Sequence, residues 1–186
     1  MVIAQKNGNP LSSDRLQTLK TLMPLIAAVV EASLEKERLI KLATRDNLTN
    51  LHTRHYFETR LQEEFTRVRR HGGVFSILQI DIDHFKHINE TCGYKEGNKI
   101  LQEVANILNT SIRKEIDIPC RYSGKQFGIL LPNTDVDGAY VLGERIRQRC
   151  EKQVFSTSQG IPVKITMSIG IAHNIEVAHE EVLQQN

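Results

Sequence analysis

The stretch that decides the fold is Arg121-Tyr122-Ser123-Gly124-Lys125-Gln126-Phe127. Its Ser-Gly pair lies between residues 118–122 and 126–132, two runs with strand composition, and such a pair is typical of a tight turn. We therefore expect a strand pair that is joined by a short loop. Upstream, residues 74–82 form an apolar run that predicts a buried central strand, and the polar segment 81–90 begins where this run ends.

Helical and strand patterns alternate on both sides of this strand pair. Gly72 and Gly73 end one helical pattern, as glycine just past a helix often does. The expected helices cover residues 54–70, 92–115 and 134–152, and a last strand with β-branched residues covers 163–172. Strands that alternate with helices predict an α/β sandwich.

The first forty-five residues carry a separate pattern. Residues 1–5 predict a short strand, residues 6–10 predict a turn, and a helix should run from Ser12 or Ser13 to about Thr44. Its apolar stripe consists of Leu16, Leu19, Met23, Ile26 and Val30. The stripe favours a homodimer seam between two such helices. A helix folded back on its own domain is the alternative, because Ser33 and Glu37 interrupt the stripe.

Composition narrows the class of protein. The chain has 186 residues, of which 40% are hydrophobic and 25% charged, as in ordinary globular proteins. Its net charge of +2 gives no support for a nucleic-acid or anionic-membrane partner. Three widely spaced cysteines fit reduced thiols better than a disulfide framework or a zinc site. The longest apolar run, residues 22–30, is too short to span a bilayer, and no secretion signal is evident, so we expect a cytoplasmic protein.

Several motifs together resemble the GGDEF family of diguanylate cyclases. They are Asp46-Asn47-Leu48-Thr49-Asn50-Leu51-His52-Thr53-Arg54, Asp81-Ile82-Asp83-His84-Phe85-Lys86-His87-Ile88-Asn89-Glu90, the 121–127 stretch and Ser168-Ile169-Gly170-Ile171-Ala172. The resemblance covers residues 46–173 and leaves 174–186 as a short tail. It implies a nucleotidyl-cyclase-like α/β sandwich with a mostly antiparallel central sheet. Residues 1–45 resemble the last strand of a GAF domain and the signalling helix that follows it.

The loop departs from the family pattern Gly-Gly-Asp/Glu-Glu-Phe at Ser123, Lys125 and Gln126, while Gly124 and Phe127 match it. In the family, Asp81 and the carbonyl of Ile82 would hold Mg²⁺ together with an acid at position 125. A cation there would repel the metal, because a unit charge about 4 Å from a divalent ion contributes on the order of 8 kcal/mol at an effective dielectric near 20. We therefore expect no catalytic residue in this loop and no cofactor, and Mg²⁺ only where a nucleotide site survives.

Other positions match the nucleotide contacts of the family in part. The resemblance assigns phosphate and guanine contacts to Phe85, Lys86, Asn89, Asn98 and Gly124. Asn98 replaces an acid of the family, and an amide cannot accept two hydrogen bonds from guanine as a carboxylate does. The alternative is that Asp81, Phe85, Asn89 and Gly124 serve only the fold.

Two further candidate sites are weaker. The family's inhibitory site, an Arg-x-x-Asp, corresponds to Lys114 and Asp117, and Arg113 lies one residue away from the arginine position. Lysine lacks the planar fork with which arginine binds phosphate or guanine. His84 and His87 have a spacing that suits metal on a helix, but no third ligand accompanies them.

Three functions follow from the resemblance and its departures. The first is a catalytically inactive regulatory domain that acts by dimerisation or by contacting another protein. The second is a sensor that binds GTP or cyclic di-GMP without turnover. The third is a weakly active diguanylate cyclase.

Overall fold

The computed structural model describes residues 13–158 and 160–174. The chain divides into two units, residues 1–42 and 43–186. The strand and turn predicted for residues 1–10 lie outside the described residues, so the GAF-like character of this segment stays a prediction.

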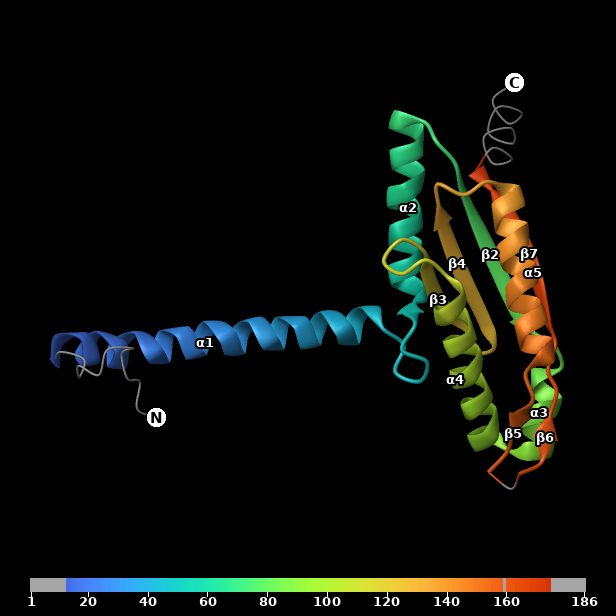
Figure 1. Ribbon diagram of the computed structural model, residues 1–186, viewed down its shortest axis with the longest axis horizontal. Helices are drawn as coiled ribbons and strands as arrows, with labels where there is room; N and C mark the ends of the chain where they lie inside the picture. Colours follow the sequence, from blue (N-terminus) through green and yellow to red (C-terminus); the bar gives the residue numbers. More distant parts are fainter. Residues whose placement is uncertain (1–12, 159, 175–186) are drawn as a thin grey trace, which may run out of the picture. The chain divides into compact units, whose positions relative to one another are not determined.

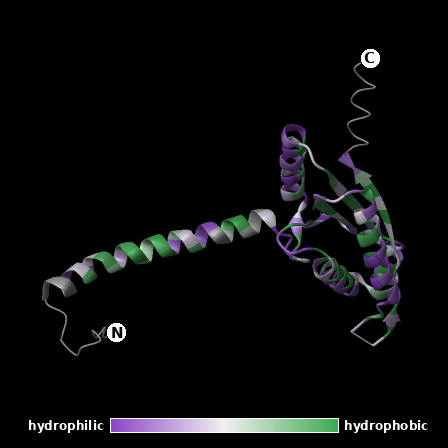
Figure 2. Cartoon of the chain, turned by 45° about the horizontal axis from the view of Figure 1, so that its top comes forward, coloured by the Kyte–Doolittle hydropathy of each residue, from purple (hydrophilic) through white to green (hydrophobic). Residues whose placement is uncertain are grey.

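The first unit is dominated by α1, which runs from Ser13 to Thr44 and confirms the predicted long helix. It contains Pro24. Figure 2 shows apolar residues along much of its length. Several large ones are exposed, among them Met23, Ile26 and Val30 of the predicted seam.

The second unit is a sheet between helices (Figure 1). Its five strands are β1 (His52–Thr53), β2 (Phe75–Ile82), β3 (Ile118–Ser123), β4 (Gln126–Pro132) and β7 (Met167–His173), in the order β1-β3-β4-β2-β7. Only the β1–β3 pair is parallel among these neighbours, which confirms the mostly antiparallel sheet. The helices are α2 (Arg54–His71), α3 (Phe85–Cys92), α4 (Tyr94–Ser111) and α5 (Val136–Lys152). Two short strands, β5 (Phe155–Ser156) and β6 (Pro162–Val163), form an antiparallel hairpin between α5 and β7 in the chain.

Alternation along β2 explains why both faces of the sheet are covered. Leu78, Ile80 and Ile82 belong to the larger core, which includes α4 and α5. Phe75 belongs to a smaller core on the other face, with Phe57 of α2. The face of β2 that carries Leu78, Ile80 and Ile82 is buried along the strand, whereas on the other face Phe75 is buried and Gln79 is exposed. The buried strand that the apolar run predicted is therefore confirmed for one face.

Some predicted boundaries were wrong. The helix expected over residues 92–115 begins after Gly93, which has φ 87°, and it ends at Ser111. The Asp117 carboxylate accepts a hydrogen bond from the backbone N–H of Arg113 at 2.8 Å, and this contact stabilises a turn in place of another helical turn. The strand expected over 163–172 is divided between β6 and β7. Helix α3 and the β5–β6 hairpin were not predicted.

Candidate functional site

The loop between β3 and β4 lies beside the end of β2. Asp81 pairs with Gln126 in the antiparallel β2–β4 ladder. The β3–β4 register shifts between Arg121 and Ser123, so the loop residues leave the regular ladder there. The sheet thus brings Asp81 and Lys125 together, as the family resemblance implies.

The Lys125 ammonium binds the two groups to which the resemblance assigns metal binding. Its Nζ lies 2.5 Å from Asp81 Oδ1 and donates to the Ile82 carbonyl at 3.2 Å. The Asp81 and Lys125 side chains are 30% and 40% exposed, so the pair is partly open to solvent. A cation of the chain itself therefore lies at the end of β2.

The other two replaced residues complete the same network. Gln126 Nε2 donates to Asp81 Oδ2 at 3.0 Å, and the Ser123 hydroxyl donates to Gln126 Oε1 at 2.7 Å. Both carboxylate oxygens of Asp81 therefore have donors from positions 125 and 126. The three departures from the family pattern interact with one another.

The residues at this position do not fit a magnesium ion. Mg²⁺ needs carboxylate oxygens with room for near-octahedral coordination, and Asp81 is the acid whose oxygens the loop already covers. The neighbouring Asp83 is bound elsewhere, since Thr166 and Ser168 donate to its oxygens at 2.7 and 2.8 Å. These hydrogen bonds, Thr166 foremost, hold the pKa of Asp83 below its usual value. Among residues 13–158 and 160–174, no group of three or more acidic, histidine or cysteine side chains has a metal-binding arrangement.

Arg121 makes a second set of contacts that holds the loop, and the sequence analysis did not identify it. Arg121 donates to the Gly124 carbonyl from Nη2 at 2.9 Å and from Nε at 3.2 Å. Its Nη1 binds Asp46 Oδ1 at 3.2 Å. Burial acts to raise the pKa of Asp46, but hydrogen bonds from Thr49 and the charge of Arg121 bring it below the usual value. The first residues of two motifs are thus in contact, a signal that spacing alone did not reveal.

The candidate nucleotide residues divide into a packed group and an exposed group. Phe85 is 8% exposed and belongs to the larger core, as a fold role requires. Asn89 lies against Gly97, where an added Cβ would overlap its side-chain oxygen. Lys86 and Asn98 are exposed, and Lys86 pairs with Glu90 at 3.6 Å. At Gly124 a Cβ would meet nothing within 4 Å, so the backbone is approachable there.

The two candidate metal histidines are exposed. His84 precedes α3 with φ 52°, in the left-handed region, and its side chain makes no capping hydrogen bond. His87 lies in the first turn of α3. No metal cluster in the described ranges includes either residue.

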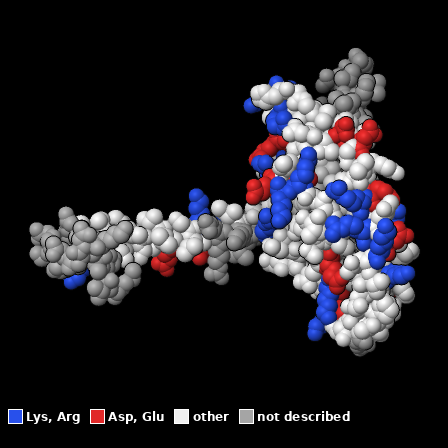
Figure 3. All heavy atoms as spheres, in the orientation of Figure 1, with Lys and Arg blue, Asp and Glu red and all other residues white. Residues whose placement is uncertain are grey.

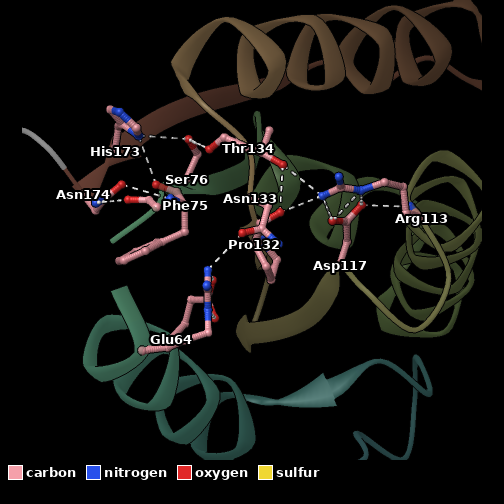
Figure 4. A network of polar contacts seen from close by, with 12 residues as sticks. Glu64, Phe75, Ser76, Arg113, Asp117, Pro132, Asn133, Thr134, His173 and Asn174 are labelled. Carbon is pink, nitrogen blue, oxygen red and sulfur yellow. Dashed lines mark hydrogen bonds and ion pairs between the residues drawn. The ribbon is translucent and has the colours of Figure 1, made fainter. Parts of the chain in front are cut away.

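The inhibitory-site remnant is organised around Arg113 instead of Lys114 (Figure 4). Arg113 Nη2 lies 2.5 Å from Asp117 Oδ1, and its Nε lies 3.1 and 3.2 Å from the two carboxylate oxygens. Nη2 also donates to the Pro132 carbonyl at 3.0 Å and to the Thr134 hydroxyl at 2.9 Å. The Asp117 side chain is 2% exposed, whereas Lys114 is exposed. Asp117 therefore serves a contact within the fold.

The face of the second unit that is drawn in Figure 3 carries charges of both signs. On the face drawn in Figure 3, Lys and Arg side chains alternate with Asp and Glu over the second unit. This mixture agrees with the net charge of +2. Within the described part of the chain, no helix combines the length and apolar character needed to cross a membrane.

Comparisons with known proteins agree with this geometry. The profile of the family described as "Diguanylate cyclase, GGDEF domain" matches residues 43–185. Diguanylate cyclase A of Treponema denticola is 35% identical over 156 residues, which are 82% of this chain and 42% of that protein. Response regulator PleD of Caulobacter vibrioides is 38% identical over 134 residues, which are 72% of this chain and 29% of that protein. The chain thus spans less than half the length of these relatives.

A solved structure shares both the sheet unit and a preceding helix. The coiled coil and GGDEF domain of DgcB from Caulobacter crescentus, in complex with c-di-GMP, superposes with a TM-score of 0.77. The sequences are 26% identical, and the match covers 83% of this chain and 81% of that one.

Proposed function

We propose that this chain, which belongs to the GGDEF family, is a regulatory domain that does not make cyclic di-GMP. The observation that carries the proposal is the Lys125 ammonium, 2.5 Å from Asp81 and 3.2 Å from the Ile82 carbonyl. Phosphoryl transfer depends on positioning and on cations that neutralise the phosphates, and metal ions stabilise both the attacking and the leaving oxygen. The ammonium supplies one positive charge where a divalent ion supplies two, and because two of its three N–H donors serve Asp81 and the Ile82 carbonyl, it cannot bind two substrate oxygens at once.

Product analysis tests this proposal directly. The full chain is incubated with GTP and Mg²⁺ or Mn²⁺ over a range of protein concentrations, and the nucleotides are separated by anion-exchange chromatography. We expect GTP to remain unchanged. Cyclic di-GMP that forms with the wild-type chain and disappears in Asp81→Ala would contradict the proposal and support a weakly active cyclase.

Regulation requires a surface that transmits a signal, and α1 offers one. Its exposed apolar side chains include Met23, Ile26 and Val30, which are 51%, 54% and 52% exposed. They follow the heptad-like spacing of the predicted seam, and burial of such a stripe against a second copy removes apolar area from water. We infer a homodimer through α1, with a further protein partner as the receiver of the signal.

Sedimentation velocity tests the seam with a matched control. Ile26→Asp places a charge in the predicted seam and should shift the chain to monomer. Leu25→Asp changes a neighbouring residue that is 62% exposed but lies outside the stripe, so it should leave the dimer intact. Equal effects of both variants, or a wild-type monomer at all concentrations, would reject this seam.

A nucleotide-binding sensor is the second candidate function. It is favoured by the approachable backbone at Gly124. Lys125 has three N–H donors, of which two serve Asp81 and Ile82, so one remains for a phosphate oxygen. Calorimetric titration with GTP and with cyclic di-GMP, each with and without Mg²⁺, tests the sensor. Absence of heat in every titration would remove it.

A further inference from the structure

A cavity of about 580 Å³ lies away from the signature loop, at the β1 edge of the sheet. It is bordered by the first turns of α2, the last turn of α4 and the turn that leads into β3. We name it the β1 edge pocket and define it by Arg45, His52, Tyr56, Arg60, Asn109 and Lys114. Its volume falls within the range of about 300–1,000 Å³ that small-molecule sites occupy.

Cations outnumber free acids in the β1 edge pocket. Arg45, Arg60 and Lys114 line it, against Glu115 and Asp117, and Arg60 is ion-paired with Glu63, which lies outside the lining. The Asp117 carboxylate is 2% exposed and bound by Arg113, so it offers no free charge to the pocket. Arg45 uses Nη1 for the Asn50 carbonyl at 3.2 Å, which leaves its other donors for a ligand.

His52 is an uncharged member of the pocket lining. Burial, followed by the charges of Arg45 and Arg60, lowers the pKa of His52 to about 4. The ring is therefore neutral at physiological pH. It stacks on Tyr56 with ring centroids 4.0 Å apart and planes 11° from parallel. The arginines thus lie beside a flat, uncharged surface.

Part of the lining is apolar. Three isoleucines and one proline between residues 112 and 119 contribute to the wall, together with the stacked rings. Ligand sites commonly combine such an apolar wall with a few convergent polar groups that fix orientation. A ligand that matches both parts carries a negative group and an apolar or aromatic body.

We propose that the β1 edge pocket binds a small organic anion, in which one phosphate or carboxylate group is attached to an aromatic or apolar body. The anion contacts Arg45, Arg60 and Lys114, and the body lies along the wall of rings and isoleucines. The pocket shares Lys114 and Asp117 with the inhibitory-site remnant, but the Asp117 carboxylate faces Arg113 and is not one of the proposed contacts. Four of the six defining residues lie on α2, on β1 or before them.

Three probes separate the two parts of the ligand. Phenyl phosphate carries both parts, inorganic phosphate carries the anion alone, and phenol carries the ring alone. Each is titrated into the full ¹⁵N-labelled chain while amide shifts are followed. We expect saturable shifts at Arg45 and at residues 112–118 with phenyl phosphate, and at least about tenfold weaker binding of either fragment.

Variants fix the location of the site. Arg60→Ala and Lys114→Ala should each weaken phenyl phosphate binding by about tenfold, because each removes a charge-assisted contact. Arg69→Ala is the matched control, since it removes one charge from the last turn of the same helix and lies outside the pocket. Both Arg60 and Lys114 are exposed, and unchanged urea midpoints would show that the variants remain folded.

Four outcomes overturn the proposal. They are shifts that do not saturate, equal weakening by Arg69→Ala, inorganic phosphate that binds as tightly as phenyl phosphate, and cyclic di-GMP that binds these amides more tightly than phenyl phosphate. The last outcome would assign the pocket to a cyclic dinucleotide. None of these measurements depends on cyclase turnover or on the signature loop.

Discussion

Asp81 and Asp117 are two carboxylates to which the GGDEF family resemblance assigns ligands, and each is bound by a cation of this chain. Asp81 faces Lys125 at 2.5 Å, with the side chains 30% and 40% exposed. Asp117 faces Arg113, also at 2.5 Å, but it is only 2% exposed and accepts from the backbone N–H as well. The two carboxylates therefore differ in burial, whereas the two cations are similarly exposed, Lys125 at 40% and Arg113 at 48%.

The difference in burial separates two roles. An exposed lysine pair contributes little to stability, because solvent screens the charges and the flexible side chains lose entropy. A buried carboxylate with a forked arginine depends on its partner, because an unpaired charge in the interior is costly. Asp117 is thus a structural residue of the turn, while the Asp81–Lys125 pair mainly determines which cation lies at the end of β2.

The largest effect is expected at Asp117. Asp117→Ala removes the acceptor of the Arg113 side-chain and backbone contacts, and we expect a loss of about 1.5–3 kcal/mol in the free energy of unfolding. Urea denaturation measures it. Lys114→Ala, in the same turn but exposed, should change stability by less than about 0.5 kcal/mol. Equal losses in both variants would remove the distinction between the buried and the exposed member of this turn.

His52 differs from both carboxylates, because it avoids a buried charge by remaining unprotonated. Its folded pKa of about 4 lies below the ordinary 6.5, so the unfolded chain takes up the proton first as the pH falls. The stabilising contribution is complete above pH 6.5 and is lost between about pH 6.5 and 4. For a partly exposed ring we expect about 1–2 kcal/mol. Urea titrations at several pH values should show that His52→Gln lacks this portion of the pH dependence; identical curves would contradict it.

Arg113→Lys tests whether the forked geometry matters. Lysine keeps the charge but cannot bind both carboxylate oxygens together with Pro132 and Thr134. We expect a loss of about 1 kcal/mol in the free energy of unfolding, measured by urea denaturation. A fully stable variant would show that charge alone holds Asp117.

The smallest effect is expected at the partly exposed Asp81–Lys125 pair. Asp81→Asn keeps the size of the side chain and removes the charge, and the pair is exposed enough that we expect a loss below about 1 kcal/mol. Thermal unfolding monitored by circular dichroism measures it. A loss as large as that of Asp117→Ala would mean that the Asp81–Lys125 contact holds the fold together, against the comparison above.

Much of the fold could be predicted from local patterns. The apolar run of β2, the Gly72–Gly73 helix end and the long α1 all followed from periodicity and from glycine chemistry. Helix α3 was not predicted because it has only eight residues, in which polar and apolar residues are mixed. The β5–β6 hairpin has two-residue strands, too short for an alternating pattern.

The candidate site was predictable in position but not in detail. The sequence placed Lys125 beside Asp81, and repulsion of a metal was the expected consequence. The direct Lys125–Asp81 pair and the donor from Gln126 depend on side-chain conformation, which a linear pattern does not contain. Arg113 binds Asp117 because α4 ends at Ser111 and the chain turns there, whereas the expected helix continued to residue 115. The Asp46–Arg121 contact joins residues that are distant in sequence.

Manganese binding followed by electron paramagnetic resonance tests the central claim most directly, because protein-bound Mn²⁺ loses the sharp signal of the free ion. The account predicts that the wild-type chain leaves the Mn²⁺ signal unchanged, since the Lys125 ammonium already binds Asp81 and the Ile82 carbonyl. Stoichiometric loss of the free signal with the wild-type chain, abolished by Asp81→Ala, would contradict it.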